Sequence, residues 1–381
     1  MSGATAGSTA GAPVFDTDAM LADLAELVRC ESFSADLAAV ARSADVVAAQ
    51  GARHLGVQPR RIVLDGVTHL QWTFGTPRVL LVGHHDTVWP MGSLATHPWS
   101  VVDGIARGPG VFDMKAGLVQ MFHALASLPS LDGIGVLITG DEEVGSTTSR
   151  ALIEDSARGC AATFVLEASA DGGALKTGRK GGSQYELVVH GKAAHAGLEP
   201  EKGINAAIEA AHLVLALGGL ADLADEGALD GWRTTVTPTV VEAGAVSNTV
   251  PDRARVTVDV RVPTIKAQER VDELIRALPT TVPGARLEVL GGPNRPPLEE
   301  SSSSALFDLA DRVASGSGLP PLRAAAVGGA SDGNFTAGVG CPTLDGLGAV
   351  GGGAHADHEH VIVSELAPRA LLLAGLIEAV R

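Results

Sequence analysis

The sequence predicts an α/β protein in which one larger domain is interrupted by a smaller α+β domain. The chain has 381 residues, which is enough for two folded units of ordinary size. Apolar runs separated by a helical pattern fill its first half, and beyond Lys180 the predicted elements follow the order β-α-β-β-α-β. We therefore expect residues 14–182 and 293–381 to form the larger domain and residues 183–292 to be inserted into it.

The elements of the larger domain follow from hydrophobic spacing. A helical pattern covers residues 17–57, where Asp16 or Thr17 can cap the first turn. A second helical pattern covers residues 116–127. Continuous apolar runs, typical of strands covered on both faces, occur at residues 78–83, 134–139 and 162–166. Strands separated by helices of this length predict a mixed or mostly parallel sheet sandwiched by helices.

The inserted segment has a different pattern. Residues 183–191 alternate like a half-exposed strand, and further strands are predicted at residues 233–242, 254–262 and 285–290. Helices are predicted at residues 203–217 and 264–278. In the first of these helices a single stripe contains Ile204, Ala207, Ile208, Ala211 and Leu215. The resulting β-α-β-β-α-β order is the ferredoxin-like arrangement.

The charge balance argues against a nucleic-acid partner. The chain carries 28 lysines and arginines against 44 aspartates and glutamates, a net charge of −16, whereas duplex binding needs a basic surface. Aromatic residues are only 3% of the chain, too few to favour stacking platforms for single strands. No run of about 18 apolar residues occurs, so no membrane span is expected.

The cysteines and the first residues indicate a cytoplasmic protein. Cys30, Cys160 and Cys341 are widely spaced and form no CxxC pair, which predicts neither a disulfide framework nor a thiolate metal site. Residues 1–13 are small and polar, with neither a positive start nor an apolar stretch. We expect them to form a disordered tail and not a signal peptide.

Ionisable residues follow the predicted strands in groups. His84, His85 and Asp86 come directly after the first apolar run. Alternate residues of an extended segment share a face, so His84 and Asp86 project to one side and His85 to the other. A histidine beside a carboxylate is a metal-ligand pattern, although a partly buried histidine pair fits this motif equally well. Asp113 stands at the mouth of the second predicted helix, where a helix cap is the alternative interpretation.

Carboxylates end two of the other predicted strands. Asp141, Glu142 and Glu143 stand together after the run at residues 134–139. Adjacent carboxylates raise one another's pKa unless a cation neutralises them, so either a cation site or a solvated acidic turn fits this motif. Glu167 ends the next strand, where a surface acid is the alternative.

The last motif is a glycine-rich loop around His355, in which the backbone can approach a ligand closely. His358 and His360 nearby are either ligands or solvent-facing residues. Together the motifs supply two histidines and at least three carboxylates at the carboxyl ends of strands, where open α/β sheets place their sites. Imidazole plus carboxylate without thiolate suits two zinc-type ions, and a carboxylate bridging them is typical of two-metal hydrolases.

The order of these motifs resembles a family of two-zinc metallopeptidases and amidohydrolases, which includes glutamate carboxypeptidase, aminoacylase and succinyl-diaminopimelate desuccinylase. The resemblance covers nearly the whole chain. It implies a zinc-peptidase-like α/β/α catalytic domain and an inserted ferredoxin-like domain that serves as a dimerisation lid. It also implies two divalent ions per subunit, zinc first and cobalt or manganese as alternatives with the same ligands.

The resemblance assigns the first zinc site and the bridging ligand. GHHDTV resembles the family's G-H-x-D-T-V, which makes His84 a zinc ligand and Asp86 its orienting partner. FDMKAG resembles D-M-K-G-G, so Asp113 is the bridging ligand and its bond to Met114 is the expected place of a cis peptide. Glu167 completes the first zinc site.

The same resemblance assigns the second zinc site and two catalytic residues. In DEEVGS, Glu142 corresponds to the general base and Glu143 to a ligand of the second zinc, which His355 completes. GKAAHAG in the inserted domain resembles G-K-x-x-H-A-G, which implies that His195 reaches the active site of the partner subunit and supports the oxyanion.

Further family positions bind substrate. They correspond to Asn248 in VSNTVP, Arg261 in VDVRVP, and Ser331, Asp332 and Gly333 in GGASDGNF.

One departure concerns specificity. Glutamate carboxypeptidase has an arginine before the GGASDGNF-like loop that holds a substrate carboxylate, and here this position falls on Ala326. Arg323 can substitute for it only if the loop shifts, so the glutamate preference does not carry over with the other positions.

The expected activity is metal-dependent hydrolysis of an amide bond, most simply by an exopeptidase that removes a C-terminal amino acid from a small peptide or an N-acyl-amino acid. An N-acyl-amino-acid amidohydrolase or a biosynthetic deacylase is the alternative with the same zinc site. A catalytically silent binding protein and a purely structural acidic protein are the alternatives from other classes.

Overall fold

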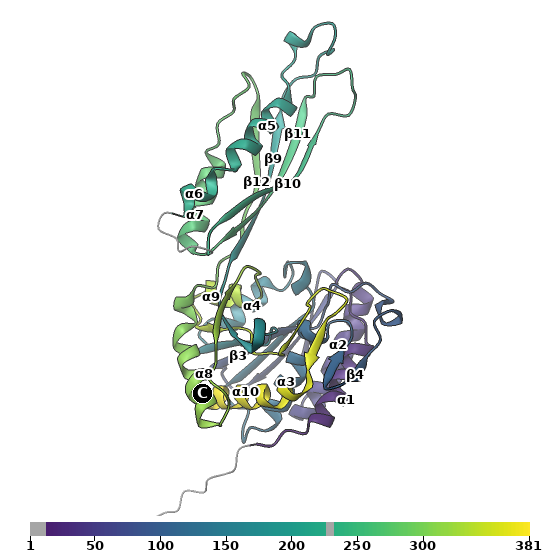
Figure 1. Cartoon of the computed structure of the whole chain (residues 1–381), viewed down its shortest axis with the longest axis vertical. Coiled ribbons are helices and arrows are strands. Elements are labelled where there is room, and N and C mark those ends of the chain that lie inside the picture. Colours follow the sequence, from purple (N-terminus) through teal and green to yellow (C-terminus); the bar gives the residue numbers. More distant parts are fainter. Residues whose placement is uncertain (1–12, 226–231) are drawn as a thin grey trace, which may run out of the picture. The chain divides into compact units, whose positions relative to one another are not determined.

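The computed structural model describes residues 13–225 and 232–381, so the predicted tail at residues 1–13 lies outside this range except for Pro13. The described chain divides into two compact units (Figure 1). The larger unit comprises residues 13–177, 303–325 and 339–381. The smaller unit comprises residues 178–225, 232–302 and 326–338. Within these residues no helix combines the length and the apolar character needed to cross a membrane.

A six-stranded sheet forms the centre of the larger unit. Its strands, in spatial order, are β1 (Arg60–Leu64), β2 (Val67–Phe74), β6 (Ile134–Thr139), β3 (Val79–His84), β7 (Ala162–Val165) and β14 (Thr343–Leu344). β6, β3, β7 and β14 run parallel to one another. β2 pairs antiparallel with both β6 and β1, so the sheet is mixed, as predicted. All residues of β3, β6 and β7 are buried, as expected for strands covered on both faces.

Helices cover this sheet (Figure 1), and the apolar faces of most of them form one continuous core with it. They are α1 (Thr17–Arg29), α2 (Leu37–Leu55), α3 (Ala116–Ala126), α4 (Arg150–Ala157), α8 (Ser304–Gly316) and α10 (Leu366–Val380). A small antiparallel sheet of the same unit contains, in order, β15 (Gly351–Gly352), β16 (His360–Ile362), β5 (Ile105–Arg107) and β4 (Ser100–Val102). Short helical turns complete the unit: η1 (Ser93–Ala95), η2 (Val111–Lys115), η3 (Glu142–Val144), η4 (Asp171–Gly173) and η7 (Val363–Glu365).

The predicted helical pattern at residues 17–57 is wrong in one respect, because the structure has two helices there. α1 ends at Arg29 and α2 begins at Leu37. Between them Phe33 bridges to Thr87, and the side chain of Asp36 accepts the N–H of Ala39 as the cap of α2. Serine and aspartate side chains compete for backbone groups and favour caps over helix interiors, which explains the break.

The hairpin of β1 and β2 was not predicted. Its turn is Asp65-Gly66, and both residues have positive φ values, 47° and 86°. Asp-Gly is a strong signal for a two-residue hairpin turn, so the sequence contained the information.

The smaller unit is an antiparallel sheet in the order β10 (Thr235–Ala243), β11 (Arg253–Val262), β9 (Gly181–His190) and β12 (Arg286–Arg295). Its main helices are α5 (Ala206–Leu217) and α7 (Ile265–Arg276), and the predicted β-α-β-β-α-β order is confirmed. Its short elements are η5 (Pro200–Lys202), α6 (Leu220–Ala224), η6 (Glu300–Ser302) and α9 (Gly333–Gly338). β8 (Leu175–Arg179) and β13 (Ala324–Val327) cross the boundaries between the units.

The predicted stripe on α5 is not the buried face of this helix. Ile208 and Leu215 are 51% and 79% exposed. The buried side instead carries Leu213 and the fully buried Glu209, whose carboxylate accepts the backbone N–H groups of Thr281 and Val282. Apolar residues surround this helix, so their spacing alone does not identify the side that faces the sheet.

Candidate metal centre

Three parallel strands deliver ionisable side chains to one edge of the central sheet. His84 is the last residue of β3, Glu143 lies in the turn η3 that follows β6, and Glu167 follows β7. Asp113 lies in η2, where its peptide bond to Met114 is cis as the sequence motif implied. His355 comes from the loop between β15 and β16 and has a positive φ of 62°.

These five side chains form two groups that share Asp113. In the first group, Nε2 of His84 lies 3.3 Å from Oδ1 of Asp113 and 3.4 Å from Oε1 of Glu167. In the second, Nε2 of His355 lies 3.3 Å from Oδ2 of Asp113 and 3.2 Å from Oε2 of Glu143. The two oxygens of one carboxylate therefore face different groups. Tetrahedral ligands at zinc bond lengths of about 2.0–2.1 Å are about 3.3 Å apart, which matches this spacing.

Several atoms of the two groups are buried without a hydrogen bond. Among the residues that the structure describes, no hydrogen-bond partner is present for Nε2 of His84, Oδ1 of Asp113 or Oε1 of Glu143. Buried polar atoms in native proteins are almost always satisfied. A cation held between them would satisfy all three, so the donor set fits a pair of divalent ions.

The electrostatics of the groups point the same way. Burial alone would lower the pKa of His84, but the carboxylates of Asp113, Asp86 and Glu167 raise it well above its ordinary value. Contacts with Asp113 and Glu143 raise the pKa of His355 to about 10. Burial raises the pKa of Glu143. Without metal the imidazoles therefore hold protons that a metal ion would replace.

Asp86 organises the backbone around the groups. Its side chain accepts the hydroxyl of Ser34 at 2.7 Å and the backbone N–H groups of Glu142 and Glu143 at 3.2 Å. Nδ1 of His84 lies 3.0 Å from the carbonyl oxygen of Asp86 and 3.5 Å from Oδ1 of its side chain. This arrangement orients His84 and fixes the turn that carries Glu142, a half-buried residue that belongs to neither group.

His85 and Asp141 serve other parts of this edge. Nε2 of His85 contacts the carbonyl oxygen of Thr68 at 3.0 Å, on the side away from the two groups, as the strand alternation predicts. The buried carboxylate of Asp141 accepts the N–H and hydroxyl groups of Thr148 and Ser149. Asp141 therefore holds the loop that follows η3.

Sequence reasoning missed Glu359. This side chain is buried, and its oxygens accept the backbone N–H groups of Gly110, Phe112 and Asp113 at 2.8–3.0 Å and the indole of Trp89 at 2.6 Å. It therefore holds the loop that presents Asp113. The sequence offered one signal, because Glu359 is an acidic residue between the candidate ligands His358 and His360.

His358 and His360, which the sequence left as ligands or solvent-facing residues, belong to neither group. Nδ1 of His360 contacts the carbonyl oxygen of His358.

The remaining predicted site residues lie in the smaller unit. His195 is exposed, and its backbone forms a bridge with Thr249, so it lies beside Asn248, whose carbonyl oxygen accepts the N–H of Ala196. Arg261 on β11 forms two hydrogen bonds of 3.0 Å with the carboxylate of Asp259.

The other three lie at the start of α9, where Ser331 and Asp332 precede the helix and Gly333 is its first residue. Ser331, Asp332 and Gly333 are buried, and Oδ1 of Asp332 lies 3.8 Å from a guanidinium nitrogen of Arg295. The structure thus brings the five residues of the two groups to one sheet edge, together with Glu142 and Asp86. It places the predicted substrate residues and His195 in the other unit.

Comparison with known proteins gives consistent matches. A family model described as peptidase family M20/M25/M40 matches residues 80–379. Carboxypeptidase G2 of Pseudomonas sp. (strain RS-16) is 31% identical over 379 residues, which cover 94% of this chain and 88% of that protein. Succinyl-diaminopimelate desuccinylase of Paracoccus denitrificans (strain Pd 1222) is 30% identical over 380 residues, covering 93% and 96%. The crystal structure of aminopeptidase PepT from Bacillus cereus ATCC 10987 matches with a TM-score of 0.73 and 24% identity, over 96% of this chain and 99% of that chain.

Proposed function

The chain belongs to the peptidase family M20/M25/M40, and from this premise we propose that it is an exopeptidase of the glutamate carboxypeptidase type. The family membership confirms the resemblance of the sequence motifs, the fold class and the general activity, which is metal-dependent hydrolysis of amide bonds. The proposed reaction is the removal of a C-terminal amino acid from a small peptide or an N-acyl-amino acid.

The observation that carries the proposal is the position of Asp113. Each of its oxygens faces a separate set of ligands, His84 with Glu167 on one side and His355 with Glu143 on the other. A carboxylate between two ligand sets is the arrangement that a dinuclear site requires, and this family is dinuclear and metal-dependent. We assign these five residues as the ligands of two divalent ions, zinc by preference, with cobalt or manganese accepted by the same ligands.

The catalytic chemistry is divided between the ions and the chain. Two ions held by these five residues would supply Lewis-acid chemistry, which polarises a scissile carbonyl and lowers the pKa of an attacking water. Glu142 takes a proton from the attacking water and passes it to the leaving amine. Its support is its place in η3, next to the ligand Glu143, with a backbone fixed by Asp86. Asp86 acts as the positioning residue of His84.

The roles proposed for the smaller unit concern the substrate. His195 is proposed to donate to the oxyanion in the active site of a partner subunit, and its exposed side chain supports this assignment. Arg261 and Asn248 are proposed to bind the substrate's carboxylate or backbone. Arg261 would exchange its contact with Asp259 for the substrate carboxylate. The loop of Ser331, Asp332 and Gly333 is proposed to line the pocket.

A homodimer through the smaller unit is part of the proposal. The apolar stripe of α5 is exposed at Ile208 and Leu215. β10 is an edge strand of its sheet, and Val240 and Val241 on it are also exposed. An open edge beside exposed apolar side chains favours pairing with a second copy. A cytoplasmic location is proposed as well, supported by three cysteines that are all free thiols.

The residues near the expected glutamate-binding position bear on which amino-acid side chain the enzyme prefers. Ala326 occupies the position of the glutamate-binding arginine, and its methyl group cannot hold a carboxylate. Arg323 is already engaged, because its guanidinium donates to the carbonyl oxygens of Asp171 and Gly172. We therefore infer a weak preference for glutamate. A biosynthetic deacylase that is restricted to one N-acyl substrate is the second candidate, favoured by the desuccinylase relative.

A substrate panel run on metal-quantified protein tests the proposal. The panel contains N-acyl-glutamates, N-acyl derivatives of neutral amino acids, dipeptides and N-succinyl-diaminopimelate. We expect release of the C-terminal amino acid from N-acyl-amino acids, loss of turnover on chelation and recovery on addition of zinc. Turnover confined to N-succinyl-diaminopimelate would select the second candidate. Protein with two ions per chain and no turnover on any member would contradict both.

A further inference from the structure

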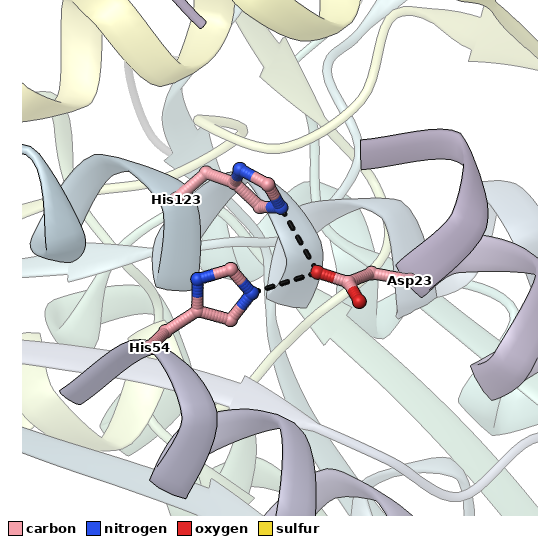
Figure 2. A group of neighbouring side chains, drawn as sticks. All are labelled: Asp23, His54 and His123. Carbon is pink, nitrogen blue, oxygen red and sulfur yellow. Dashed lines mark hydrogen bonds and ion pairs between the residues drawn. The ribbon is translucent and has the colours of Figure 1, made fainter. Parts of the chain in front are cut away.

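A second gathering of histidine and carboxylate lies on the helices of the larger unit. Asp23 belongs to α1, His54 to the last turn of α2 and His123 to the last turn of α3. Figure 2 shows both imidazole rings directed at the same carboxylate. His123 is seven residues beyond Ala116, the first residue of α3, which is about 10 Å along the helix axis. The group is therefore separate from the ligands at the sheet edge.

The nitrogens of the two histidines converge on a single oxygen. Oδ2 of Asp23 lies 2.7 Å from Nε2 of His54 and 3.0 Å from Nε2 of His123. One atom from each residue lies within 4.8 Å of the other two. Two imidazole nitrogens and one carboxylate oxygen that lie this close together are the ligand set of an open zinc site, whose remaining position is taken by water. A modest outward movement to ligand spacings of about 3.3 Å would admit the ion.

The scaffold keeps these side chains in place and accessible. The ring of His54 stacks parallel to Phe122 at 6.2 Å between centroids, and it lies 4.4 Å from the ring of His123. The side chains of Asp23, His54 and His123 are 16%, 18% and 11% exposed, so an ion can enter from solvent. Because both histidines lie in the last turns of their helices, the helix dipoles also favour a cation there.

The neighbouring guanidinium contacts one oxygen of Asp23, while the two imidazoles hold the other. Arg53 supplies this guanidinium, which lies 3.0 Å from Oδ1 of Asp23 and is neutralised in part by Glu26 at 2.6 Å. Burial opposes ionisation of Asp23, but contacts with His54, His123 and Arg53 keep its pKa below the ordinary value. Burial lowers the pKa of His123. An ionised carboxylate and a neutral imidazole are the forms that bind metal.

We propose that Asp23, His54 and His123 bind a third divalent ion of the zinc class through Oδ2 and the two Nε2 atoms. The ion joins α1, α2 and α3 and so stabilises the packing of these helices. It takes no part in hydrolysis, and the site does not depend on the function proposed for the sheet edge.

Zinc stoichiometry tests the site by difference. The full chain is equilibrated with zinc alone, and bound zinc is measured by mass spectrometry for the native protein and for His54→Gln and His123→Gln. We expect each variant to bind one ion per chain fewer than the native protein and to keep its hydrolytic turnover. His190→Gln is the matched control, because His190 also contacts a carboxylate, Glu288 at 2.8 Å, but forms no ligand-like group of three among the described residues. Equal zinc content in the native protein and both variants would overturn the site.

A second measurement covers the case in which the variants fail to fold. Crystals of the native protein soaked in zinc are measured at the zinc absorption edge. We expect an anomalous peak within about 2.0–2.2 Å of the three named atoms. Peaks at the sheet edge without one between these atoms would overturn the site while leaving the catalytic centre intact. A peak only on the helices would support the site and contradict the function proposed for the sheet edge.

Discussion

The larger unit holds two gatherings of histidine and carboxylate, and they differ in spacing. At the sheet edge the imidazole nitrogens stand 3.2–3.4 Å from the carboxylate oxygens. On the helices the corresponding distances are 2.7 and 3.0 Å, which are ordinary hydrogen bonds. The sheet edge is therefore already open to the width of an ion, whereas the helical group must break its own hydrogen bonds first. We expect tighter metal binding at the sheet edge.

Support is the second difference between the two gatherings. At the sheet edge, strands buried on both faces lead into three of the proposed ligands, and Glu359 holds the loop of Asp113. On the helices, Asp23 instead shares its carboxylate with Arg53, whose side chain is half-exposed. A competing cation must leave or adjust when an ion binds. The comparison teaches that a fold can gather the same residue types for different purposes, and that spacing and support separate them.

The largest expected effect separates the two gatherings completely. Asp113→Ala removes the carboxylate that faces both ligand sets, so we expect the loss of both sheet-edge ions and of all turnover. Asp23→Ala is the matched change in the helical group, and we expect it to lose one ion at most and to keep turnover. Metal content and turnover measured on the same samples check this. Asp113→Ala protein that retained two ions at the sheet edge would contradict the bridging assignment.

Glu142→Ala has the next largest effect because it removes the proposed base without removing a ligand. We expect turnover to fall by about 10²–10⁴-fold, the usual range for general base catalysis, with the sheet-edge metal content unchanged. Glu154→Ala is the matched control, since Glu154 is a partly exposed acid of α4 in contact with Arg150. Retained turnover in Glu142→Ala would remove Glu142 from the mechanism.

The same comparison explains what the sequence could predict. Each proposed ligand at the sheet edge belongs to a short motif, after an apolar strand for His84, Glu143 and Glu167, at the mouth of a helix for Asp113 and in a glycine-rich loop for His355. The motifs alone left other interpretations open, and the resemblance to the family singled these residues out. The helical group has no such motif, because His54 and His123 lie 31 and 100 residues from Asp23 on separate helices. Only the packing of three helices brings them together, and helix packing is not encoded in any short pattern.

Other misses have similar physical causes. Glu359 acts through backbone N–H groups 246–249 residues away, and a backbone contact leaves no signature in the partner's sequence. The stripe on α5 was visible, but apolar residues on several sides of the helix hid its buried face. The fold class was predictable because strand burial and the β-α-β-β-α-β order are local, repeated signals.

His195→Ala sharpens the comparison between the two units. We expect turnover to fall by about 10²–10³-fold, as for loss of one oxyanion donor, with metal content unchanged at both gatherings. In the proposed dimer with shared sites, an equal mixture of this variant and Glu142→Ala protein is expected to restore about a quarter of native turnover, because half of the proposed dimers then contain one intact site.

The dimer itself has its own control. Leu215→Glu places a charge on the exposed stripe of α5 and is expected to weaken the proposed dimer in light scattering, whereas Val63→Glu on β1 of the larger unit is not. In the mixing experiment with His195→Ala and Glu142→Ala proteins, no recovery of turnover would exclude a site shared between subunits.

Glu359→Gln tests the support of the sheet edge rather than its ligands. A glutamine amide presents a donor to N–H groups that need an acceptor, so the loop of Asp113 loses part of its anchor. We expect a loss of about 10–100-fold in metal affinity, which is typical of residues that orient ligands. Competition with a fluorescent chelator measures it. Affinity equal to that of the native protein would show that the loop needs no such support.

Proton release on metal binding is the smallest expected effect, and it differs between the two gatherings. In metal-free protein the pKa of His84 is well above its ordinary value and that of His355 is about 10, so both imidazoles are protonated at neutral pH. Zinc must displace these protons, and we expect about two protons released per chain at the sheet edge. Because protons compete with the metal, metal affinity at the sheet edge rises with pH until the pH exceeds about 10, the pKa of His355. His123 has a lowered pKa and contributes no proton at neutral pH.

Calorimetry in buffers of different ionisation enthalpy counts the protons. No release by His123→Gln protein, which retains the sheet edge alone, would contradict the protonation assigned there.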